Sequence, residues 1–206
     1  MNRTEYYQQM KELARGTRVK YGLTSPRVMK SDIRRIYKDL GIHIDLWNHK
    51  FKKLRGAYFN DDLGPTVVIV QGLPPDPTIF TMAHELKHHL VDRHLPIACC
   101  EVDPRNEMIE IGAEIFAAEF IFPEDDFARL LSEMGVTQGN CNPANLVRLK
   151  RQTQTTLSYA GLAKRAEFLD FAPSGSFAKV KWHKVEEEIY GEPTYKRVLR
   201  RRRSQR

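Results

Sequence analysis

Two histidines and a glutamate lie at a spacing that suits a metal ion. The stretch from Phe80 to His88 contains H-E-x-x-H, formed by His84, Glu85 and His88. Four residues make about one helical turn, so the two imidazoles project from the same face of a helix. Such a pair can bind Zn²⁺, and Glu85 beside it can take a proton from a water that the metal activates. The spacing therefore predicts metal-assisted hydrolysis of a peptide bond.

The residues around this motif indicate a helix of the core. The apolar neighbours are Ile79, Phe80, Met82, Ala83, Leu86, Leu90 and Val91. The alternative is a surface helix that carries two histidines by chance, since the motif fixes only three residues. An apolar surrounding favours the first interpretation, because buried polar side chains need partners.

A catalytic type of zinc site needs a third protein ligand, and the next helix offers candidates. Asp103 and Pro104 are typical of a helix start, and Pro123 ends the segment. Three glutamates lie three and four residues apart on one stripe of this helix: Glu107, Glu110 and Glu114. A solvated acidic face is the alternative. The apolar residues between the acids favour a stripe that is partly buried and neutralised, which a divalent metal would achieve.

The two segments together resemble the ImmA/IrrE family of bacterial metallopeptidases, which are of the gluzincin type. The strings FTMAHELKHHL and EIGAEIFAAEFIFP, within residues 78–123, carry the resemblance. Alignment on Phe116–Glu119 implies that Glu110 is the family's ligand glutamate. Lys87 stands where the family usually has Gly, and Glu114 stands where it often has Asn. We expect Lys87 to point away from the metal.

The resemblance implies a role for each residue of the site. His84, His88 and Glu110 would hold Zn²⁺, and Glu85 would be the general base. Glu114 would accept the second ring N–H of a ligand histidine and so orient it. Glu107 remains a rival ligand by spacing.

The pattern along the chain predicts an α+β fold. Helices are expected at 4–15, ending at Gly16, and at 26–40, and strands at 42–47, 56–60 and 66–71. By resemblance this is a zincin-like small mixed sheet, packed on the H-E-x-x-H helix and a second ligand helix and followed by a mostly helical part. The expected domains are a metallopeptidase core at 1–135 with N-terminal helices, a helical extension at 136–195 packed on it, and a basic, disordered tail at 196–206.

The positive charge of the chain is concentrated in that tail. The net charge is +7 in 206 residues, and residues 196–206 hold seven Lys and Arg and no acid, so the remainder is formally neutral. The tail can attract nucleic acid by simple electrostatics, but a solubilising terminus explains it equally well. Residues 145–168 have the outline of a helix–turn–helix, which is also an ordinary structural unit. A nucleic-acid partner is therefore not favoured.

Cysteine usage and hydropathy predict a cytoplasmic protein. Cys99 and Cys100 are adjacent, Cys141 is distant, and this odd set has no disulfide spacing. No apolar segment is long enough to span a membrane, and the first residues lack an apolar signal region.

By resemblance, we expect a zinc-dependent endopeptidase that cuts a specific protein inside the cell. The family's substrates are helix–turn–helix transcriptional repressors, whose cleavage switches on gene expression. The alternative is a metal-stabilised regulatory binding module with little catalysis.

Overall fold

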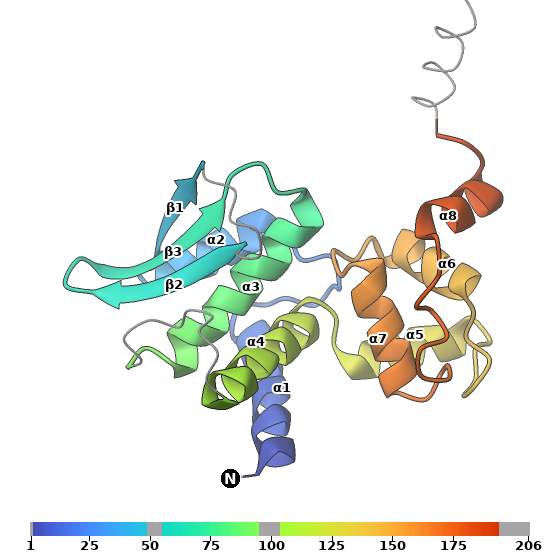
Figure 1. Cartoon of the computed structure of the whole chain (residues 1–206), viewed down its shortest axis with the longest axis horizontal. Helices are drawn as coiled ribbons and strands as arrows, with labels where there is room; N and C mark the ends of the chain where they lie inside the picture. The colour runs from blue at the N-terminus through green and yellow to red at the C-terminus, as the bar shows by residue number, and fades with distance from the viewer. Residues whose placement is uncertain (1, 49–54, 95–103, 194–206) are drawn as a thin grey trace, which may run out of the picture. The chain divides into compact units, whose positions relative to one another are not determined.

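The computed structural model describes residues 2–48, 55–94 and 104–193 of the chain (Figure 1). It confirms the predicted α+β class, because the described residues form eight helices and one small mixed sheet. The chain divides into two compact units, Met1–Asp126 with Thr153–Ser158, and Phe127–Gln152 with Tyr159–Arg206. The domain boundary expected after residue 135 stays a prediction.

The first unit contains the sheet and both helices of the expected metal site. Its elements are α1 (Arg3–Lys20), α2 (Lys30–Asp39), β1 (His43–Trp47), β2 (Gly56–Asp61), β3 (Gly64–Val70), α3 (Pro75–Val91) and α4 (Pro104–Ile121). The strand order is β1-β3-β2, with β1 parallel and β2 antiparallel to β3. The middle strand β3 buries Val67, Val68 and Ile69, as expected for the apolar run in its sequence.

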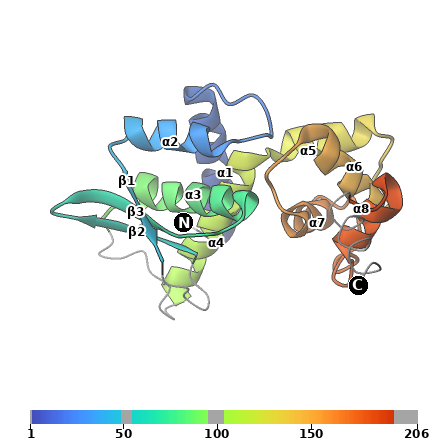
Figure 2. The ribbon, with the colours of Figure 1, turned by 90° about the horizontal axis from the view of Figure 1, so that it is seen from above.

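The H-E-x-x-H helix α3 lies at the centre of this unit. It contacts β2 and β3 on one side, α4 on another, and α2, which runs beside it (Figures 1 and 2). The side chains of Ile79, Met82, Ala83 and Leu86 are buried. Tyr37 of α2 is fully buried and donates a hydrogen bond to the carbonyl of Met82, 2.6 Å away. The predicted core helix is confirmed.

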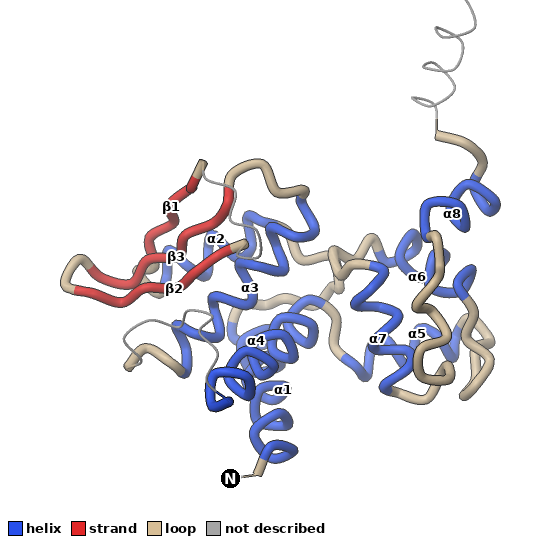
Figure 3. The backbone as a smooth tube through the Cα atoms, viewed as in Figure 1, coloured by secondary structure: helices blue, strands red, loops and turns tan. Residues whose placement is uncertain are grey.

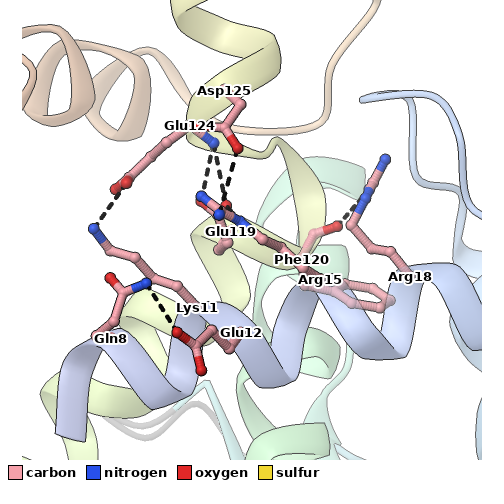
Figure 4. Close-up of polar contacts among 9 residues, drawn as sticks. All are labelled: Gln8, Lys11, Glu12, Arg15, Arg18, Glu119, Phe120, Glu124 and Asp125. Carbon is pink, nitrogen blue, oxygen red and sulfur yellow. Dashed lines mark hydrogen bonds and ion pairs between the residues drawn. The ribbon is translucent and has the colours of Figure 1, made fainter. Parts of the chain in front are cut away.

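The first helix is longer than the sequence suggested, and the expected stop at Gly16 was wrong. Its last turn is retained because Arg18 is buried and donates to the carbonyl of Phe120 (Figure 4). Arg18 also donates to the carbonyl of Ile121, at 3.4 Å. These carbonyls end α4 and would otherwise lack partners. Arg15 also donates to the buried Glu119 at 2.7 Å. Tertiary contacts to α4 thus outweigh the weak helix propensity of a glycine.

Gly112 lets α1 lie close against α4. A Cβ built at this position would lie 2.6 Å from Cε1 of Tyr6, which is 5% exposed. Gly16, in the interior of α1, is exposed and has nothing within 4 Å of its Cβ position. Gly112 is therefore required by the packing of α1 on α4, whereas nothing in the packing around Gly16 requires a glycine.

The second unit is helical, with loops between its elements (Figure 3). It contains most of α5 (Glu124–Glu133), which begins in the first unit, and then α6 (Pro143–Thr153), α7 (Tyr159–Phe168) and α8 (Trp182–Tyr190). Phe127, Leu146, Leu149 and Leu162 are fully buried. Tyr159 stacks on Trp182 with ring centroids 5.0 Å apart.

Among the described residues no helix is both long and apolar enough to cross a membrane. Cys99, Cys100, Asp103 and the basic tail 196–206 lie outside the described residues, while Cys141 is a buried free thiol.

We expect alanine at Gly112 and alanine at Gly16 to change the free energy of unfolding in opposite directions. Gly112→Ala forces the buried ring of Tyr6 to move, so we expect the free energy of unfolding to fall by about 1–3 kcal/mol. Gly16→Ala, the matched control, removes only a weak helix former and should raise it by about 0.5–1 kcal/mol. Urea unfolding of both variants measures the difference. Equal effects of the two substitutions would contradict the close contact between α1 and α4.

Candidate metal centre

Three side chains from α3 and α4 converge in the first unit. Nε2 of His84 lies 3.1 Å from Oε2 of Glu110 and 3.2 Å from Nε2 of His88. Nε2 of His88 lies 3.5 Å from Oε1 of Glu110. His84 and His88 are one helical turn apart on α3, and Glu110 faces them from α4. One donor atom from each residue lies within 4.8 Å of the others, so together they could hold a metal ion.

Burial differs among these three residues in a way that suits a partly open site. The side chain of His88 is 1% exposed, that of His84 17% and that of Glu110 30%. Burial opposes protonation of His84, but the hydrogen bond to Glu110 and the neighbouring carboxylates outweigh it and raise the pKa of His84. Burial also disfavours ionisation of Glu110, yet its bond to His84 and the nearby cationic groups lower its pKa. The cluster therefore favours a positive charge between these side chains.

The second ring nitrogen of His88 is held by a residue that sequence reasoning missed. Nδ1 of His88 lies 2.8 Å from Oδ2 of Asp92, which caps the C-terminus of α3 and is 4% exposed. A carboxylate on Nδ1 makes that nitrogen the donor and leaves Nε2 as a lone-pair ligand. The sequence did carry a signal, because Asp92 follows His88 by one helical turn.

Lys87 does not lie among the three donor atoms, in keeping with the expectation that it points away from them. It is nevertheless fully buried, and its Nζ lies 2.6 Å from Oδ2 of Asp92. It also donates to the carbonyl of Ile109 on α4 at 3.1 Å. Burial lowers the pKa of Lys87, and the bond to Asp92 works against that effect.

Glu85 belongs to α3, and its side chain is buried against the sheet, beside Gly56 of β2. Its exposed fraction is 4%, and burial raises the pKa of its carboxyl group to about 7. A Cβ built on Gly56 of β2 would lie 3.0 Å from Oε1 of Glu85 and would collide with Cγ2 of Thr81. The absence of a side chain at Gly56 thus leaves the space that the Glu85 carboxylate occupies.

The other polar candidates do not belong to the group of three donors. Glu107 is exposed and pairs with Arg3, Nη2 to Oε2 3.7 Å, so its position does not support the rival ligand. Glu114 is exposed on α4, and its charge contributes to the raised pKa of His84. Its role in orienting a histidine stays a prediction. His89 faces the sheet, where Nδ1 lies 3.1 Å from the hydroxyl of Tyr58.

The donor set fits a divalent transition metal. Two imidazoles and one carboxylate are the protein ligands of a common class of catalytic zinc site, which keeps a further position for water or substrate. Manganese and iron also accept this set, so the ligands alone do not define the metal.

Comparison with known proteins agrees with this site. The family model described as the IrrE N-terminal-like domain matches residues 38–162, a segment that includes α3, α4 and the sheet. Among solved structures, a Mycobacterium tuberculosis transcriptional regulator is similar in fold, with a TM-score of 0.55 and 13% sequence identity. The match covers 78% of this chain but 46% of that regulator. No curated protein sequence matches significantly. The chain belongs to the ImmA/IrrE family of metallopeptidases.

Proposed function

We propose that this protein is a zinc-dependent endopeptidase that cuts a peptide bond in a specific protein substrate. The observation that carries the proposal is the convergence of His84, His88 and Glu110 within 4.8 Å, with Glu85 one residue from His84. A bound zinc ion would supply Lewis-acid polarisation of the scissile carbonyl and activation of a water molecule. Membership of a metallopeptidase family supports the same reaction.

Metal binding, orientation of a ligand and proton transfer would be carried out by different residues of the site. His84, His88 and Glu110 bind the ion, and Asp92 fixes the ring of His88 through Nδ1. Glu85 accepts the proton of the attacking water and later delivers it to the leaving amine, as base and then as acid. Burial raises the pKa of the Glu85 carboxyl group, which makes its carboxylate a stronger base. Glu114 is proposed to support His84 electrostatically.

A peptide substrate has a place to bind beside these residues. Within the described part of the chain, β2 pairs only with β3, so its other edge has free backbone groups. Gly56 of β2 lies against Glu85, as its Cβ position shows. An extended peptide that adds to this edge would pass close to Glu85. We propose β2 as the strand that holds the substrate.

The substrate that we propose is a helix–turn–helix transcriptional repressor, cut in the cytoplasm so that gene expression is switched on. The support is family membership, together with the fold shared with a transcriptional regulator. A protease of this kind must spare other proteins, so it would need a recruited substrate or an activating signal. Rapid digestion of casein by the unstimulated protein would contradict this specificity.

A second candidate is a metal-stabilised regulatory module that acts by binding. The description of the solved relative as a transcriptional regulator favours it. Binding through the basic tail 196–206 would add a steep salt dependence to any nucleic-acid affinity, lost when the tail is deleted. The two candidates differ in whether Glu85 is needed, which the variant Glu85→Gln decides.

Metal content tests the ligand set. We expect about one zinc per purified chain in the wild type, and little or none in Glu110→Ala, because two histidines alone bind zinc weakly. Glu107→Ala, three residues away on the same helix, is the matched control and should keep its zinc. Elemental analysis after gel filtration gives the ratio. Zinc retained in Glu110→Ala, or lost in Glu107→Ala, would move the site away from the proposed ligands.

Glu85→Gln separates hydrolysis from binding. The amide is nearly isosteric but cannot accept the proton, so we expect hydrolysis to slow by about 10²–10⁴-fold while zinc content is unchanged. The assay is mass spectrometry of new N-termini in a proteome-derived peptide library incubated with each protein. If the wild type cuts nothing in the library or in a co-expressed repressor, and Glu85→Gln keeps the biological effect, the binding module is the better description.

Gly56→Ala tests the space beside Glu85. The new methyl group would collide with Thr81, so we expect the free energy of unfolding to fall by about 1–3 kcal/mol. The double variant Gly56→Ala/Thr81→Ser lacks the colliding Cγ2 and should recover a large part of that loss. Denaturant unfolding of the two single variants and the double variant measures the coupling. Strictly additive effects would mean that the methyl group added at position 56 does not touch Cγ2 of Thr81.

A further inference from the structure

The amine of Lys87 joins the two helices that bear the candidate metal ligands. Its Nζ lies 2.6 Å from Oδ2 of Asp92 at the end of α3 and 3.1 Å from the carbonyl of Ile109 on α4. The side chain is 0% exposed. The aromatic ring of Tyr6 from α1 covers the amine, with the ring centroid 5.5 Å from Nζ. Lys87 is therefore enclosed by three helices and cannot serve as a solvated surface charge.

Lys87 is linked to the metal site through one oxygen atom, Oδ2 of Asp92. Oδ2 of Asp92 accepts from Lys87 and lies 2.8 Å from Nδ1 of His88. All three side chains are nearly or fully buried, at 0%, 6% and 1% exposure for Lys87, Asp92 and His88. A carboxylate held by one donor can still rotate, whereas two donors on the same oxygen fix its plane. The Lys87 amine thus restrains the group that orients the His88 ring.

Lys87 is also linked to the metal site through α4, by its hydrogen bond to the carbonyl of Ile109. Ile109 immediately precedes Glu110 in α4, so a restraint on its carbonyl acts on the backbone that presents the Glu110 carboxylate. Since the three donor atoms must stay close together, the distance between α3 and α4 matters as much as the side-chain rotamers. The Lys87 amine restrains both the distance between α3 and α4 and the rotamer of the His88 side chain.

We propose that Lys87 is a positioning residue of the metal site, which raises zinc affinity by fixing Asp92 and His88 on α3 and the backbone before Glu110 on α4. This inference rests on the proposed function only in that His84, His88 and Glu110 bind zinc. The competing explanation is that Lys87 merely balances the buried charge of Asp92. In that case its loss would lower stability without a specific effect on the metal.

The test is a zinc titration of the full chain in competition with a chromogenic chelator. Lys87→Met keeps most of the bulk of the side chain, ends one bond short of Nζ and removes both hydrogen bonds. We expect its zinc affinity to fall about 10-fold or more, within the range seen when groups behind metal ligands are removed. Asp92→Asn should weaken zinc binding by about 10–100-fold. The double variant should lose less than the product of the two single effects, because Lys87 acts in part through Asp92.

Lys11→Met is the matched control. It removes a comparable half-buried ion pair in the same unit, between Lys11 Nζ and Oε2 of Glu124, 2.8 Å apart (Figure 4). Neither residue of that pair belongs to the donor group of His84, His88 and Glu110. We expect Lys11→Met to unfold at lower denaturant concentration in the presence of chelator, with zinc affinity within about 2-fold of the wild type.

Three results would overturn the inference. The first is a folded Lys87→Met with wild-type zinc affinity. The second is an affinity loss in Lys87→Met that is matched by Lys11→Met at equal loss of stability. The third is a double variant that shows the full product of the single effects.

If Lys87→Met does not fold, Lys87→Gln replaces it. The glutamine side chain is one bond shorter and cannot reach both acceptors, so unchanged affinity in this variant also rejects the role. A wild type that binds no zinc would instead reject the proposed function, and this inference with it.

Discussion

The structure of the first unit depends on giving partners to the polar side chains that α3 buries. The polar side chains concerned are Glu85, Lys87, His88 and His89. Three parts of the unit surround these four side chains. Glu85 occupies the space beside Gly56 on β2, Lys87 and His88 share the carboxylate of Asp92, and His89 lies against the hydroxyl of Tyr58 on β2. Lys87 also donates to a carbonyl of α4. A helix with polar groups on several buried faces cannot pack on one apolar surface. It needs a sheet and a second helix placed around it, which is the observed arrangement.

The second ligand helix is in turn held by α1, which precedes the segment matched by the family model. Figure 4 shows Arg18 at the carbonyl of Phe120, near the end of α4, and Arg15 bound to the buried Glu119. Tyr6 lies close to Gly112, as the Cβ position of that glycine shows. These contacts lie along α4 on the side of α1 and fix its position lengthwise. Because α4 provides Glu110, a shift of this helix would move a candidate ligand. The N-terminal helix is therefore part of the structure that forms the site.

The sequence predicted the short-range part of the site and missed what depends on the position of side chains across helices. The spacing of His84 and His88 is a property of one helical turn, so it could be read directly, and the family resemblance selected Glu110 over Glu107. Asp92 was not predicted, because the family resemblance assigned the partner of a ligand histidine to Glu114 on α4, whereas Asp92 lies at the end of α3. The end of α1 was misplaced because Gly16 weakens a helix locally, while the contacts of Arg18 to α4 are tertiary. Propensity could not reveal them.

The buried pair of Lys87 and Asp92 is better explained by geometry than by stability. The free-energy cost of removing two charges from water is about as large as the gain from their attraction. A protein with an apolar pair of similar size at the same place is therefore often no less stable. The same pair can, however, fix a direction in space, because both groups make short hydrogen bonds with defined angles. Here that direction passes through Oδ2 of Asp92 to Nδ1 of His88. To hold one ion, the donor atoms of His84, His88 and Glu110 must stay close together. Lys87 lies behind them, where one amine contacts both helices.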